Sequence, residues 1–170
     1  MTLEFILFII FSLVAAVSAI LMITRANPVI SALFLILNFA SLAGLYLLLN
    51  AQFIAVAQVI VYAGAIMVLF LFVIMLLKPE KEKLFTMHPK VKIFAVLIVV
   101  LVFIQLVYII LLSHPSSLSN PVPSESVKAG TVEQIGRQLF TNYVLPFEAA
   151  GFLLLAAVIG ALVLAKKKFD

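Results

Sequence analysis

Five blocks of about twenty consecutive apolar residues make up most of this chain, and they limit what it can fold into more than any other feature. A block of this length matches an α-helix that crosses a hydrocarbon core of roughly 30 Å. Of the 170 residues, 66% are hydrophobic and 11% are charged, which leaves too little polar surface to cover a water-soluble domain. We therefore predict an all-α, multi-pass membrane protein with a single membrane domain, 1–170, and spans at about 3–24, 28–49, 53–77, 93–112 and 144–165.

A shorter segment of different character precedes the last block. Residues 131–141 mix polar and apolar side chains, whereas the five long blocks are almost uniformly apolar. An amphipathic segment of this kind is typical of a helix that lies in the membrane interface. We predict such a short interfacial helix at about 131–141.

Lysine and arginine are distributed unevenly between the two ends of the predicted spans. If the N-terminus is outside, nine of the eleven basic residues fall on the inner side, and only Lys128 and Arg137 remain outside. Because the cytoplasmic ends of membrane helices carry an excess of Lys and Arg, this bias predicts an outside N-terminus and an inside C-terminus. The same placement accounts for the net charge of +4 without nucleic acid as a partner.

The sequence lacks the residues that most catalytic or metal centres require. There is no cysteine, so disulfides and thiolate-bound iron–sulfur clusters are excluded. No nucleophile–base pair, glycine-rich phosphate loop or metal-ligand set can be assembled from the remaining residues. We therefore expect neither a catalytic residue nor a metal site in this chain.

Several uncharged polar residues do fall within the predicted spans, namely Asn38, Gln58 and Gln105. An unpaired polar group in hydrocarbon costs several kcal/mol, so each of them needs a partner. They either form hydrogen bonds between helices or line a path that water can enter, and the sequence leaves both interpretations open. Glu148 is an acidic residue near the outer interface, one turn inside the fifth span, where it serves as an anchor or in a proton relay.

The segment from Gln58 to Phe70, QVIVYAGAIMVLF, closely resembles the third helix of subunit J of respiratory complex I. The mitochondrial counterpart of subunit J is the sixth mitochondrially encoded membrane subunit. Four other segments resemble the same family, and together they cover nearly the whole chain. They are NPV at 27–29, LYLLL at 45–49, GTVEQIG at 130–136 and YVLPFE at 143–148.

The resemblance implies a non-catalytic membrane-arm subunit of a proton-translocating NADH:quinone oxidoreductase. Its expected partners in this hetero-oligomer are the membrane subunits A, H, K and N, together with lipid. Quinone, FMN and iron–sulfur clusters would belong to partner subunits, so no cofactor is expected in this chain. The family resemblance also implies a location in the inner cell membrane of a prokaryote.

The resemblance further implies a π-bulge in the third helix that can rotate and thereby couple quinone reduction to proton pumping. The residues implied in this gate are Tyr62, Ala63, Gly64, Ala65, Met67 and Val68. Gly64 lies between two alanines, so a local change of backbone meets little steric resistance there. No charged residue lies in the middle of any predicted span, and this favours a conformational gate over a proton carrier.

Three other functions remain open on sequence grounds. The first is the equivalent small subunit of a cation/proton antiporter or membrane-bound hydrogenase. The second is a stand-alone transporter or channel, which predicts a charged or strongly polar site within the chain. The third is a purely structural anchor, for which Tyr62 and Gly64 should tolerate replacement.

Overall fold

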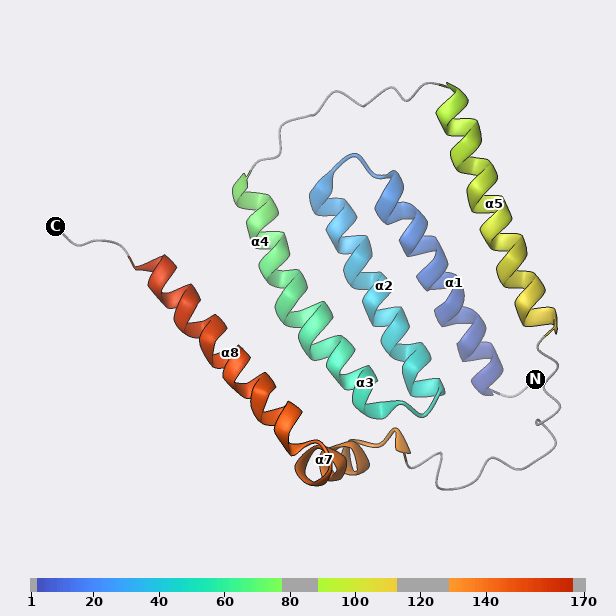
Figure 1. Ribbon diagram of the computed structural model, residues 1–170. Coiled ribbons are helices and arrows are strands. Elements are labelled where there is room, and N and C mark those ends of the chain that lie inside the picture. The colour runs from blue at the N-terminus through green and yellow to red at the C-terminus, as the bar shows by residue number, and fades with distance from the viewer. Residues whose placement is uncertain (1–2, 78–88, 113–128, 167–170) are drawn as a thin grey trace.

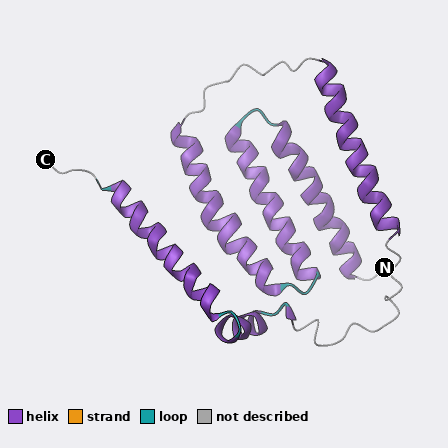
Figure 2. Ribbon diagram, viewed as in Figure 1, coloured by secondary structure: helices purple, strands orange, loops and turns teal. Residues whose placement is uncertain are grey.

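The computed structural model describes residues 3–77, 89–112 and 129–166, and all its regular elements are helical (Figures 1 and 2). Five of the helices are long and apolar enough to cross a membrane, so the predicted all-α fold with five spans is confirmed. The third span, Gln52–Leu77, is divided into an α-helical, a π-helical and a second α-helical part. The elements are α1 Leu3–Thr24, α2 Pro28–Leu48, α3 Gln52–Ala57, η1 Gln58–Ile66, α4 Met67–Leu77, α5 Pro89–Leu112, α7 Val132–Thr141 and α8 Val144–Ala165.

The helix bounds differ from the sequence-based ones by a few residues. The second span ends at Leu48 and the third begins at Gln52, each one residue before the predicted position. The helix α5 begins at Pro89, four residues before its membrane-spanning part, Ile93–Leu112, which has the predicted bounds. Proline is favoured at a helix start because its missing N–H has no partner to lose there.

α1, α2 and the third span lie side by side and form the packed part of the structure (Figure 1). Small residues allow α1 and α2 to approach closely, as expected for helices in lipid. A Cβ on Gly44 would come within 2.7 Å of the Phe11 ring, so this position has no room for a side chain. Ala32, Ala43 and Ala55 are likewise buried.

Both ends of α2 are fixed by local hydrogen bonds. At its start, the Asn27 side chain accepts a hydrogen bond of 3.0 Å from the backbone N–H of Val29, and Pro28 occupies the first helical position. At its end, Asn50 adopts a positive φ of 60°. The backbone N–H groups of Asn50 and Ala51 donate to the carbonyls of Leu47 and Tyr46, the pattern of a Schellman motif. These caps produce the tight turn between the second and third spans.

α7 lies across the end of the bundle at which α2 is joined to α3 (Figure 1). The Thr131 side chain caps α7 by accepting a hydrogen bond of 3.3 Å from the Gln134 N–H. Just before α7, the Gly130 carbonyl accepts a hydrogen bond of 3.1 Å from the Phe53 N–H. The segment that leads into α7 is therefore attached to the start of the third span.

α5 and α8 lie outside this packed layer. Within the described part of the chain, α5 contacts no other element and α8 contacts only α7. The contact between α7 and α8 includes Phe140 and Phe147, whose ring centroids are 4.8 Å apart in an edge-to-face arrangement. Large apolar side chains along both α5 and α8 are exposed, so each presents a full apolar helix surface to lipid or to another protein.

Candidate functional site

The π-helix in the middle of the third span is the main irregular feature of the membrane-spanning helices. It covers the nine residues of η1 and lies between α3 and α4 without a break in the helical rod. The stretch that the sequence implied begins four residues later, at Tyr62. Four of its members, Tyr62, Ala63, Gly64 and Ala65, lie in η1, while Met67 and Val68 lie in the first turn of α4.

The π-helix determines which residues of the third span face α2. Among the described elements, the only spanning helix that contacts η1 and α4 is α2, so buried side chains on these two segments face α2. Gln58 is 8% exposed and Met67 is 2% exposed, although they are nine residues apart. At about 3.6 residues per turn, an α-helix would place them about half a turn apart, on opposite faces. A π-turn closes over one more residue, with roughly 4.4 residues per turn, and this brings both side chains to the same face.

Gly64 contributes to this geometry through its missing side chain. A Cβ at position 64 would lie 3.2 Å from the carbonyl oxygen of Val59, which is tighter than an ordinary van der Waals contact. Val59 precedes Gly64 by five residues, which is the spacing of a π-helical hydrogen bond. The close approach follows from this π-helical spacing, and a side chain at position 64 would require the Val59 carbonyl to move by a few tenths of an ångström.

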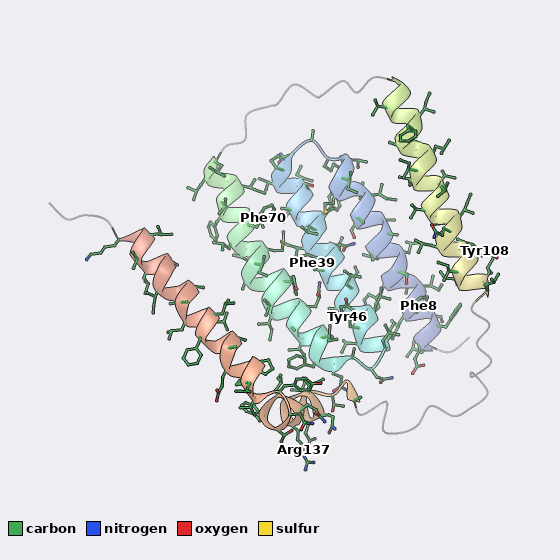
Figure 3. The ribbon with its side chains drawn as sticks, in the orientation of Figure 1. Phe8, Phe39, Tyr46, Phe70, Tyr108 and Arg137 are labelled. Atoms are coloured by element: carbon green, nitrogen blue, oxygen red, sulfur yellow. The ribbon has the colours of Figure 1, made fainter. Side chains whose placement is uncertain are left out.

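Tyr62 contacts α2 through its ring. The centroids of the Tyr62 and Phe39 rings are 5.8 Å apart with an interplanar angle of 65°, an edge-to-face pair of the kind that aromatic rings prefer. Figure 3 shows Phe39 on α2 beside the third span. Tyr62 is nevertheless 48% exposed, so part of its side chain faces away from this chain. Nothing in the sequence distinguishes Phe39 from the other phenylalanines, of which the chain has 15 in all.

Gln58 combines burial with an amide that has no partner. The residue is 8% exposed and forms no hydrogen bond among the described residues, and its amide atoms keep some access to the surroundings, since no fully buried side-chain N or O atom in the described part of the chain is unpaired. Because the amide carries two donors and an acceptor, it remains available for water or for a group that arrives when the helix changes. It is the first residue of the π-helix.

Asn38 is placed differently and serves to hold α1 and α2 together. Its Nδ2 donates a hydrogen bond of 2.7 Å to the Ala15 carbonyl and one of 3.3 Å to Ser18 Oγ. Ser31 also reaches α1, where its hydroxyl donates to the Met22 carbonyl. For these residues the structure supports interhelical hydrogen bonding, the first of the two interpretations that the sequence left open.

The remaining polar candidates lie on the helices outside the packed layer. Gln105 is exposed on α5, and Glu148 is exposed on α8. Neither has a hydrogen-bond or ion-pair partner within the described residues. The structure does not bring them near Gln58 or Tyr62, since α5 and α8 contact none of the three packed spans. Within the same residues, no three His, Cys, Asp or Glu side chains gather in one place.

Comparison with known proteins identifies the family. The family described as NADH-ubiquinone/plastoquinone oxidoreductase chain 6 matches residues 18–164. The chain belongs to this family. A relative named NAD(P)H-quinone oxidoreductase chain 6, from Leptolyngbya boryana, is 42% identical over 164 residues, which is 94% of this chain and 79% of the relative.

Other members of the family carry the name that the sequence suggested. A relative named NADH-quinone oxidoreductase subunit J, from Rickettsia bellii, is 34% identical over 170 residues, covering 97% of this chain and 82% of its own. A third, NAD(P)H-quinone oxidoreductase subunit 6 of the Paulinella chromatophora organellar chromatophore, is 44% identical over 142 residues, with 83% and 67% of the two chains covered. The resemblance to the subunit J family is therefore confirmed.

Proposed function

We propose that this chain is a non-catalytic membrane-arm subunit of a proton-translocating NADH:quinone oxidoreductase, and that its third span is a gate coupling quinone reduction to proton pumping. The family membership supports the first part. The gate is supported by one observation: Gln58 and Met67 are buried on the same face of the third span, which only a π-helix between them allows. In the gate's second state, η1 would be α-helical.

A change from π to α would rotate the two halves of the third span against each other. Nine residues make about two turns as a π-helix but about two and a half turns as an α-helix. The two halves would therefore turn by roughly half a turn, so that either Gln58 or Met67 would leave the α2 interface. Both forms keep nearly the same number of backbone hydrogen bonds, so their free energies can be close enough for an external event to select one.

The polar groups of the span give such a rotation a chemical consequence. The Gln58 amide has no partner in the observed state, and an unpaired amide at this depth favours a nearby water molecule. Rotation would move the amide, together with the half-exposed Tyr62 hydroxyl, relative to the neighbouring subunits. The chain would thus control the hydration of a proton path while other subunits carry the ionisable groups.

The exposed helices fit a subunit of a larger assembly. α5 and α8 present apolar surfaces that no described element of this chain covers, and subunits A, H, K and N are the proposed neighbours in a hetero-oligomer. Quinone, FMN and the iron–sulfur clusters would be bound by partner subunits. The proposed location is the inner cell membrane of a prokaryote, with the N-terminus outside and the C-terminus inside. Relatives named NADH-quinone oxidoreductase support this assignment over an antiporter or hydrogenase subunit.

The gate can be tested with Gly64→Leu in the intact complex. The Cβ of a leucine at position 64 would lie 3.2 Å from the Val59 carbonyl oxygen in the π form, a tight contact that disfavours this form, so the variant should assemble normally and reduce quinone with less proton translocation. Gly151→Leu is the matched control, because no atom outside its own helix backbone lies within 4 Å of a Cβ at that position. Normal proton pumping by the assembled Gly64→Leu complex would rule out the gate. Failure of the tagged chain to co-purify with redox subunits would rule out the wider assignment.

A further inference from the structure

A cleft opens between the ends of α1, α2 and α4 at the side of the bundle where α1 turns into α2. It has a volume of about 280 Å³ and an almost entirely apolar lining. The lining residues are Met22, Pro28, Ser31, Ala32, Leu35, Phe70 and Ile74. The polar one among them, Ser31, already donates its hydroxyl to the Met22 carbonyl. Figure 3 shows Phe70 on α4.

The lining restricts the chemistry of any occupant of this cleft. With the Ser31 hydroxyl engaged, a polar ligand would have to leave its own hydrogen bonds unmade, at a cost of several kcal/mol in hydrocarbon. An aliphatic chain meets no such cost. A methylene group is similar in size to a water molecule, ~30 Å³, so the cleft has room for a stretch of acyl chain rather than a complete molecule.

Arg25 carries a positive charge on the connection that joins the two cleft-lining ends of α1 and α2. It lies in the short connection between α1 and α2, three residues after Met22 and three before Pro28, both of which line the cleft. Its guanidinium carbon is 5.8 Å from the centroid of the Phe34 ring, within the range of a cation–π contact. Within the described residues no carboxylate pairs with Arg25, so its N–H donors are available to an anion.

We propose that this cleft is a binding site for an anionic phospholipid. One acyl chain lies against Leu35, Phe70 and Ile74, and the phosphate pairs with Arg25, whose planar N–H groups suit phosphate oxygens. Arg25 directly follows the end of the spanning helix α1 at Thr24, so the charge is expected at headgroup depth and the cleft at acyl-chain depth, which suits a phospholipid. The cleft is described in the π-helical state, because Phe70 and Ile74 belong to α4, and lipid binding to it can be tested without measuring proton pumping.

The experiment uses the intact complex, purified in mild detergent through a tag on this chain, and phospholipids that carry a photoreactive diazirine in the acyl chain. Two probes are compared, phosphatidylglycerol and phosphatidylcholine, and labelled peptides are mapped by mass spectrometry. Label from phosphatidylglycerol is expected on peptides that contain Met22 to Leu35 and Phe70 to Ile74, with less from phosphatidylcholine. Equal labelling by the two lipids would overturn the proposal, because it would show no recognition of the anionic headgroup.

Two variants and two matched controls complete the test. Arg25→Gln removes the charge and should lower phosphatidylglycerol labelling about fivefold, the contribution of one basic residue near an anionic lipid. Leu35→Phe fills the cleft and should lower it similarly. Lys166→Gln removes a cation from the end of α8, and Leu33→Phe enlarges an exposed residue of α2 outside the lining. Equal labelling in all four complexes, or lipid label on a neighbouring subunit with none on the cleft peptides, would refute the site.

Discussion

Gln58 and Met67 face the same neighbouring helix although they are nine residues apart in one span, a separation that an α-helix would turn into opposite faces. The two half-buried residues between them are Ala63 and Gly64, and Ala63 follows Gln58 by five positions and precedes Met67 by four. Within α4, the less exposed residues return to spacings of four and three, at Leu71 and Ile74. Along this face, the spacing between buried or half-buried residues is thus longer in η1 and shorter in the α-helix that follows.

Gly64→Ala is the mildest change that should alter this arrangement. Its methyl group would lie 3.2 Å from the Val59 carbonyl in the π form, whereas an α-helix accepts alanine and prefers it to glycine by about 1 kcal/mol. We expect a larger population of the α-helical form of η1. The number of protons translocated per quinone reduced should then fall, while the subunit composition of the complex stays normal. Gly151→Ala gains the same helix propensity in open space and should pump normally. An unchanged ratio in Gly64→Ala would contradict the expected shift.

Substitutions at Tyr62 separate its ring from its hydroxyl. Tyr62→Phe keeps the edge-to-face contact with Phe39, so the thermal stability of the complex should remain that of the wild type. Tyr62→Leu loses an aromatic pair worth about 0.5–1.5 kcal/mol and should lower it. If the hydroxyl takes part in the gate, both variants will pump fewer protons. Full pumping by Tyr62→Phe would show that only the ring matters.

Asn38→Leu should weaken the pairing of α1 and α2. The variant removes the hydrogen bonds to the Ala15 carbonyl and to Ser18, and such bonds between membrane helices contribute about 0.6–2 kcal/mol. We expect a lower thermal midpoint for the detergent-solubilised complex. Ser41→Ala is the control, since the Ser41 hydroxyl bonds only to the Leu37 carbonyl of its own helix. Equal midpoints for the two variants would show that Asn38 is not an interhelical clamp.

Gly130→Ala should detach the segment that leads into α7. A Cβ there would come within 2.2 Å of the Asn50 carbonyl oxygen, so the backbone must move and the hydrogen bond from the Phe53 N–H to Gly130 is strained or lost. We expect faster proteolysis near α7 in right-side-out membrane vesicles. The control is Gly136→Ala within α7, where a methyl group meets nothing within 4 Å. Equal rates for the two variants would contradict the close approach at Gly130.

The predicted orientation can be tested directly because the chain has no cysteine of its own. Single cysteines at exposed positions, Ala26→Cys between α1 and α2 and Thr141→Cys at the end of α7, place one label on each side of the membrane. With the N-terminus outside, a membrane-impermeant maleimide should reach Thr141→Cys in intact cells and Ala26→Cys only after permeabilisation. The reverse pattern would invert the topology, and labelling after denaturation controls for shielding by other subunits.

The sequence determined the features that depend on local chemistry and on the membrane as solvent. Five apolar blocks of spanning length predicted five helices, because backbone polar groups in hydrocarbon must be satisfied within each segment. The start of α2 was expected from Pro28, and the amphipathic segment before the last span is observed as α7. Gly64 between two alanines indicated where the backbone could depart from α-helical geometry.

Only the tertiary structure decided which face of each span is buried. The third span is apolar apart from a few residues such as Gln58 and Tyr62, so its sequence carries no clear period from which its orientation could be read. Contact with α2 selects Gln58 and Met67 for burial and pairs Tyr62 with Phe39. The same contact distinguishes Asn38, which is bonded to α1, from Gln58, whose amide has no partner among the described residues. In lipid, where apolar faces differ little in solvation, close packing and the pairing of polar groups determine the orientation of a helix.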